Sequence, residues 1–180
     1  IQYPYLPIPK KEMDSAFFKE KIEKKLIAKI NEFKPSVIFS VDNEFGGYGH
    51  PEHVFLSQLV VDLFLNDSII ADRIYQGVYT DHMEKEIIEK WLFNRMKKYN
   101  FPDTYSIAKK KYNLPGGMPQ PTVQINIKKQ AEEKMKYLLS YHYDARKNMK
   151  KFIPYFEEFD AETYFSIFDR EFFRVIKKPQ

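Results

Sequence analysis

The chain has 180 residues, of which 43% are hydrophobic and 17% aromatic, and its formal net charge is +4. This composition is too apolar and aromatic for an intrinsically disordered protein, and no apolar run reaches the roughly 18 residues of a membrane span. The absence of cysteine excludes a disulfide framework, a cysteine-ligated zinc site and a cysteine nucleophile, but it assigns no compartment. The length suits one domain, which we expect to cover residues 1–180.

The first half of the chain alternates helix and strand signals. Apolar residues at spacings of three and four predict a helix over Lys10–Lys34, which Pro35 ends. Val37–Val41 is a β-branched apolar run typical of a strand buried on both faces. The three glycines and the proline of Asp42–Pro51 predict a loop, and Glu52–Phe64 reads as the next helix.

The second half continues this alternation. We predict strands at Arg73–Tyr79 and Thr122–Ile127, helices at Lys85–Tyr99, Lys129–Phe152 and Ala161–Phe168, a loop at Asn113–Pro121, and a strand or tail at Phe172–Ile176. Strands that alternate with helices favour an α/β fold with a mainly parallel sheet and helices on both faces.

The basic residues form short runs rather than one basic face. These runs are interleaved with acidic or aromatic residues, and we interpret them as solvated helix faces: Lys109–Lys111, Lys128–Lys129, Lys147–Lys151 and Lys177–Lys178. We therefore do not expect a nucleic-acid partner, because such a protein would need a clustered basic surface and salt-dependent binding.

Two histidines three residues apart, His50 and His53, follow the first predicted strand. Open α/β sheets place their ligands just beyond the carboxyl ends of strands, and at the start of a helix this spacing puts both imidazoles on one side of the first turn. Neutral imidazole is a common zinc ligand, but paired histidines also occur on ordinary surfaces. A catalytic zinc needs three protein ligands, and the spacing alone supplies no third. His82 reads as an exposed loop residue.

The segment from Pro35 to Phe64 resembles the second signature of the LmbE/PIG-L-type N-deacetylases. That signature consists of a strand, an acidic glycine-rich loop, the sequence Gly-His-Pro-Asp-His and a helix. The matching residues here are Pro35 to Val41, Asp42, Gly46, Gly47, Tyr48, Gly49, His50, Pro51, Glu52 and His53. Weaker similarities lie in Leu138–Arg146 and Glu171–Arg174. The resemblance implies a Rossmann-like domain of which this chain is the C-terminal portion.

The resemblance also implies a reaction and a site. The reaction is zinc-dependent hydrolysis of an N-acetyl group on an amino sugar or glycoconjugate. His53 would be a zinc ligand, His50 would act on the tetrahedral intermediate, Glu52 would tune His50, and Tyr48 would contact the reacting centre. Together with Gly47, the residues Asp42 and His142 are candidates for substrate binding.

The chain departs from the family pattern at one decisive point. The N-terminal His-Pro-Asp-Asp motif, which in the family supplies two zinc ligands and the general base, does not occur in the 180 residues. Because the chain begins at Ile1 rather than at Met, we expect an N-terminal segment of the same protein to carry it. The alternative is a non-catalytic ligand-binding or interaction module on the same scaffold.

Two of the candidate residues have plain structural alternatives. Asp42 either touches a sugar hydroxyl or caps the loop that follows it, since aspartate commonly satisfies backbone N–H groups in turns. His142, which we expect on the core-facing side of the predicted Lys129–Phe152 helix, is either a pocket wall or a satisfied core histidine.

Overall fold

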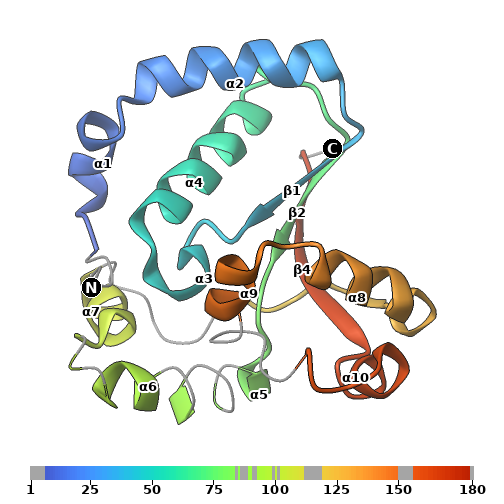
Figure 1. Cartoon of the computed structure of the whole chain (residues 1–180). Coiled ribbons are helices and arrows are strands. Elements are labelled where there is room, and N and C mark those ends of the chain that lie inside the picture. The colour runs from blue at the N-terminus through green and yellow to red at the C-terminus, as the bar shows by residue number, and fades with distance from the viewer. Residues whose placement is uncertain are drawn as a thin grey trace. The chain divides into compact units, whose positions relative to one another are not determined.

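The computed structural model describes residues 7–83, 85, 89–90, 93–98, 100, 102–111, 119–149 and 156–178 (Figure 1). The chain divides into two compact units. The first comprises Ile1–Val123 and Phe173–Gln180, and the second comprises Gln124–Phe172.

The helix predicted over Lys10–Lys34 is two helices, α1 (Lys10–Ala16) and α2 (Lys19–Phe33). The break falls at Phe18, whose backbone is left-handed with φ of 51°. The turn has a packing reason, because the ring of Phe17 lies 5.0 Å from that of Phe55, between centroids. The apolar periodicity continues across the break, so it does not reveal it.

Strand β1 (Val37–Val41), helix α4 (Pro51–Leu65) and strand β2 (Arg73–Gly77) form a strand–helix–strand unit. The two strands are parallel and pair in register from Val37 with Arg73 to Val41 with Gly77. Helix α4 lies between α2 and the strand pair (Figure 1). The bounds predicted for β1 are confirmed, but the expectation that it is buried on both faces is wrong, because Phe39 and Val41 are exposed. Helix α4 begins one residue before and ends one residue after the predicted bounds.

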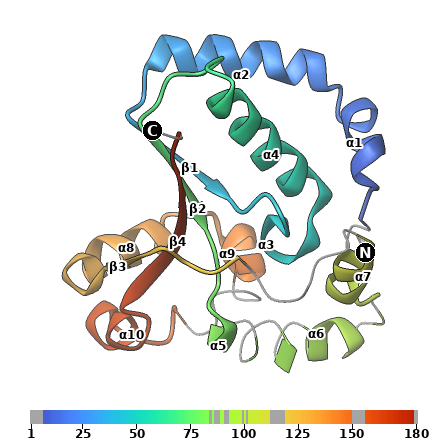
Figure 2. The ribbon, with the colours of Figure 1, turned by 180° about the vertical axis from the view of Figure 1, so that it is seen from behind.

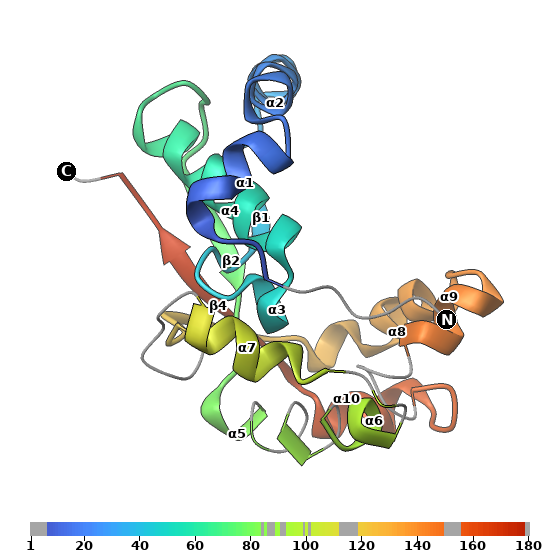
Figure 3. The same ribbon diagram turned by 90° about the vertical axis from the view of Figure 1, so that its left-hand side faces the viewer.

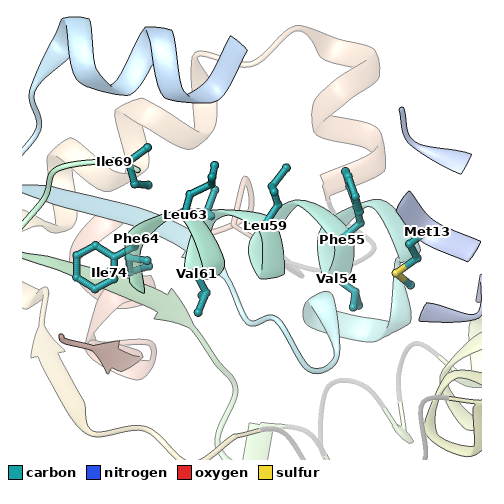
Figure 4. Close-up of a cluster of buried hydrophobic side chains, with 10 residues drawn as sticks. Met13, Val54, Phe55, Leu59, Val61, Leu63, Phe64, Ile69 and Ile74 are labelled. Carbon is teal, nitrogen blue, oxygen red and sulfur yellow. The ribbon is translucent and has the colours of Figure 1, made fainter. Parts of the chain in front are cut away.

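Helix α4 carries most of the core of the first unit. Its apolar side chains meet Met13 of α1 at one end and Ile69 and Ile74 at the other (Figure 4). The buried residues of this core are Met13, Val54, Phe55, Leu59, Val60, Val61, Leu63, Phe64, Ile69 and Ile74. Burying one side chain of this size contributes about 1.5–3 kcal/mol to the stability of the fold. The core therefore holds α4, and with it the end of the loop that leads into α4, in place.

The prediction of a mainly parallel sheet is wrong, whereas the mixed α/β class is confirmed. The strand order is β1-β2-β4-β3, where β3 is Val123–Asn126 and β4 is Arg170–Ile176. Strand β4 pairs antiparallel to β2, from Ile74 with Ile176 to Gly77 with Phe173. An apolar β-branched pattern predicts a strand but not its direction. The alternation of helices and strands led us to expect parallel pairing, but β4 runs antiparallel to β2.

Coverage of the β1–β2 pair is also uneven. Ile38 and Ile74 face α4 and its core. On the opposite face Phe39 stacks on Tyr75 at 5.5 Å between ring centroids and stays 66% exposed.

Between β2 and β3 the described elements are short helices: α5 (Asp81–Met83), α6 (Phe93–Lys98) and α7 (Thr104–Lys111). Helix α6 lies within the predicted Lys85–Tyr99 helix, of which residues 86–88, 91–92 and 99 lie outside the described part of the chain. The predicted Asn113–Pro121 loop lies largely outside it. Helix α7 was not predicted. No helix in the described part of the chain is long and apolar enough to cross a bilayer.

The second unit contains η2 (Lys128–Gln130), α8 (Ala131–Leu139), α9 (Tyr143–Met149) and α10 (Ala161–Ile167) (Figure 2). It has its own core of Ile127, Ala131, Met135, Leu138, Phe156, Ala161, Tyr164 and Phe165. The predicted long helix is interrupted after α8, where the Arg146 guanidinium donates to the carbonyls of Leu139 and Tyr141 at 2.9 and 2.7 Å.

Candidate functional site: a histidine pair at the end of strand β1

The loop after β1 is built around the carboxylate of Asp42, which is fully buried. One oxygen accepts the backbone N–H groups of Glu44 and Phe45, at 3.0 and 2.5 Å, and the other accepts that of Gly47 at 2.8 Å. This is the loop-capping role, one of the two roles considered for this residue. Asp42 thus ties three backbone amides of the loop together at the carboxyl end of the parallel pair.

Burial raises the pKa of the Asp42 carboxyl above its ordinary value. The three backbone donors and the charge of Arg174 oppose that rise because they stabilise the ionised form. The carboxylate is therefore compensated by N–H dipoles and a guanidinium, as a buried charge requires.

The glycines of the loop form a single helical turn, α3 (Gly46–Gly49), that packs against the start of α4 (Figure 3). Gly46 has φ of 60°, and a Cβ there would lie 2.8 Å from both the His53 Cβ and the Val54 amide nitrogen. Gly47 is also left-handed, with φ of 82°, but a Cβ there would meet nothing within 4 Å. Gly46 is thus required for close approach and Gly47 for backbone conformation alone.

His50 and His53 flank the first turn of α4. His50 is the N-cap residue with extended backbone, and Pro51 occupies the first helical position, where its missing N–H costs nothing. The two imidazole rings stack, with centroids 4.3 Å apart and planes inclined by 17°. The structure therefore brings together the two histidines that the sequence singled out.

The tautomer of His53 follows from its contact with the loop. Its Nδ1 lies 3.0 Å from the carbonyl oxygen of Gly46. A carbonyl can only accept, so Nδ1 carries a proton, and in the neutral ring Nε2 then carries the lone pair. Histidines that ligate metals commonly donate their second ring nitrogen to a carbonyl in this way, which fixes the ring for coordination.

His50 has a different electrostatic setting. Burial lowers its pKa below the ordinary value, the neighbouring His53 lowers it further, and the carboxylate of Glu52 opposes both effects. At neutral pH the His50 ring is therefore mainly uncharged, so it can accept a proton. Glu52 itself is exposed on the first turn of α4 and influences His50 through its charge.

A residue from the far end of the chain completes the loop, and the sequence did not single it out individually. Arg174 on β4 donates through Nε and Nη2 to the side-chain oxygen Oε1 of Gln76, at 3.1 and 2.7 Å. It also donates to Asn43 Oδ1 at 2.6 Å and forms an ion pair with Glu44. The available signal was an arginine inside the otherwise apolar run of residues 172–176.

The remaining predicted site residues have varied positions. Tyr48 belongs to α3, and its side chain lies outside the described part of the structure. Gly47 donates its N–H to Asp42. His142 belongs to the second unit, between α8 and α9, with 84% of its side chain exposed. The expectation that it faces the core is wrong, because the helix that would have turned it inward ends at Leu139.

Within the described residues no three His, Cys, Asp or Glu side chains are grouped to hold a metal ion. His53 fits one zinc ligand, but a catalytic zinc takes three from the protein, so these residues do not complete such a site. No family model matches the chain, and no curated protein or solved structure matches it significantly. A functional assignment therefore rests on the site itself.

Proposed function

We propose that this chain contributes the His-x-x-His half of the active site of a zinc-dependent N-deacetylase of the LmbE/PIG-L type. The substrate class is an N-acetylated amino sugar or glycoconjugate. The observation that carries the proposal is the contact of His53 Nδ1 with Gly46, because it presents Nε2 as the coordinating atom at the carboxyl end of a parallel strand pair.

The chain's own residues would play distinct parts. His53 would hold zinc, which when bound polarises an amide carbonyl and acidifies water. His50, uncharged and stacked on His53, would exchange a proton with the reacting amide group. Glu52 would favour the protonated form of His50 after that transfer. Asp42 would act on the loop rather than on the substrate, because three backbone N–H groups occupy its carboxylate.

The missing ligands have a natural place in the sheet. Strand β1 is at one end of the strand order, so no described strand pairs with its outer edge. A further parallel strand on the outer edge of β1 would end at the same edge of the sheet, beside the His50–His53 loop. We propose that the N-terminal segment with the His-Pro-Asp-Asp motif pairs there and supplies the other ligands and the base.

The test is metal and product analysis of the full-length protein that contains this chain. We expect about one zinc per site and release of acetate from an N-acetylglucosamine conjugate. A His82→Ala variant is the matched control, because His82 is an exposed histidine of α5 and has no part in the proposal.

The incomplete ligand set favours one competing function, a non-catalytic ligand-binding module. A full-length protein that neither retains zinc nor releases acetate would support this module and contradict the deacetylase. Sequencing the segment before Ile1 separates the two as well, since a strand followed by His-Pro-Asp-Asp is required only by the enzyme.

A further inference from the structure

Arg174 joins three parts of the first unit through one guanidinium. Strand pairing places it opposite Gln76 of β2, so both side chains lie on the same face of the sheet. Its donors then reach Gln76, Asn43 and Glu44. Gln76 is fully buried and lies on a paired strand, so it is a fixed reference point. Asn43 and Glu44 lie near the start of the loop that leads to the histidines.

The network continues from the loop to helix α4. Asn43 accepts from Arg174 and donates through Nδ2 to Gln58 Oε1 at 2.7 Å, and Gln58 Nε2 donates to Asp62 at 2.8 Å. Asn43 thereby links β4 to the helix that begins at the histidine pair. The Asp42 carboxylate holds the loop from inside through backbone N–H groups, whereas Arg174 holds it through side chains.

We propose that Arg174 is the positioning residue of the histidine pair. By bonding Asn43 and Glu44 as well as Gln76, it holds the loop so that the Gly46 carbonyl accepts a hydrogen bond from the Nδ1–H group of His53. This inference rests on the proposed function in one respect: that function explains why His53, as a metal ligand, needs to be held in one orientation. The residue acts through the loop and touches neither histidine in the described contacts.

The chemistry of arginine suits this role better than that of lysine. A planar guanidinium can serve Gln76, Asn43 and Glu44 at once, whereas an ammonium group is a compact donor on a flexible stem. Removal of the guanidinium would leave the Oε1 of the buried Gln76 without its two donors, and Glu44 without its cation. The loop would then be held by Asp42 and by the hydrogen bond from Asn43 to Gln58.

The test uses four variants of the full-length protein: Arg174→Met, Arg174→Lys, Glu44→Ala and Arg170→Met. Arg170 is the matched control, because it lies on the same strand but contacts Gln124 and Asp169. The first readout is the ¹⁵N spectrum of the His53 ring, which reports the Nδ1-protonated tautomer. The second is zinc affinity by competition with a chelator, and the third is urea unfolding.

We expect Arg174→Met to give a mixture of His53 tautomers and a 10- to 100-fold loss of zinc affinity, the usual effect of losing an outer-shell contact. Arg174→Lys should restore part of both, and Arg170→Met should leave both unchanged. Glu44→Ala keeps the partly buried guanidinium of Arg174 bonded to Gln76, so this variant tests the inference if Arg174→Met does not fold. It should shift the tautomer in the same direction.

Two results would overturn the inference. One is a wild-type His53 tautomer in folded Arg174→Met, or in Glu44→Ala where Arg174→Met does not fold. The other is an equal change in Arg170→Met. Wild-type protein without zinc or activity would contradict the proposed function, yet the tautomer readout would still decide the role of Arg174. Zinc binding that survives every substitution, with His53 unperturbed, would keep the function and reject the clamp.

Discussion

Gly46 and His53 approach each other at two points. The Gly46 carbonyl oxygen lies 3.0 Å from His53 Nδ1, and a Cβ added to Gly46 would lie 2.8 Å from the His53 Cβ. The backbone of the loop is thus fitted to one side chain of the helix that follows it. A change at either residue reaches the other directly.

Gly46→Ala should therefore cost far more than Gly47→Ala. Both positions are left-handed, which costs a residue with a Cβ roughly 1–2 kcal/mol, but only at Gly46 does the new carbon overlap backbone and side chain. We expect a loss of unfolding free energy of at least about 3 kcal/mol for Gly46→Ala and about 1 kcal/mol for Gly47→Ala, measured in urea. Equal losses of unfolding free energy in the two variants would show that the close approach of Gly46 to His53 does not contribute to the cost of the substitution.

Substitution of the two histidines should have different effects if the proposed function holds. His53→Ala should release zinc from the full-length protein, because it removes a ligand atom. His50→Ala should keep zinc and lower the turnover number by about 10²- to 10⁴-fold, the usual contribution of a positioned proton-transfer group. Zinc content and the rate of acetate release distinguish these outcomes, and zinc retention in the His53 variant would count against its assignment.

Asp160 provides a pH-dependent contribution in the second unit. Its carboxylate caps α10 by accepting the Thr163 N–H at 2.8 Å, and this hydrogen bond lowers the pKa of Asp160 below its ordinary value. The stabilisation is complete above the ordinary aspartate pKa of about 3.9 and is lost as the pH falls through the lower folded-state value.

Asp160→Ala should accordingly be less stable than wild type at neutral pH, and the difference should shrink in acid. Asp160→Asn keeps a capping oxygen but does not titrate, so it should stay close to wild type at neutral pH. Urea unfolding at neutral and acid pH checks both variants. A pH-independent difference between wild type and Asp160→Ala would contradict the linkage.

Lys34 is a site where a substitution should stabilise the protein. It ends α2 with φ of 51° and is exposed, and its N–H donates to the Ile30 carbonyl at 2.8 Å. Lys34→Gly keeps that bond and removes the left-handed strain, so we expect a gain of up to about 1 kcal/mol. Ala28→Gly, in the exposed helix interior, should lose about 1 kcal/mol by comparison. Thermal unfolding of the pair tests the sign at each position.

Local patterns in the sequence predicted the parts of the fold that local patterns control. Val37–Val41 was found because a short β-branched run admits few alternatives, and the Asp42 cap because aspartate after a strand satisfies turn amides. The breaks at Phe18 and after Leu139 were missed. Packing of Phe17 on α4 and the hydrogen bond from Arg146 to Leu139 accompany these breaks, and apolar periodicity reports neither contact.

The histidine pair could be read from the sequence because its members are neighbours. Arg174 could not, since the ion pair that joins it to Glu44 spans 130 residues. The direction of β4 is hidden for the same reason: strand polarity depends on pairing between distant segments, and one sequence does not record which segments meet.

That separation has a consequence for the order in which the protein is made. During translation the loop of Asn43 and Glu44 emerges 130 residues ahead of the strand that holds it. At about 5–20 residues per second, the ribosome needs on the order of ten seconds to deliver Arg174. Throughout that interval the nascent histidines lack their clamp, so we expect the loop to mature only after synthesis of β4.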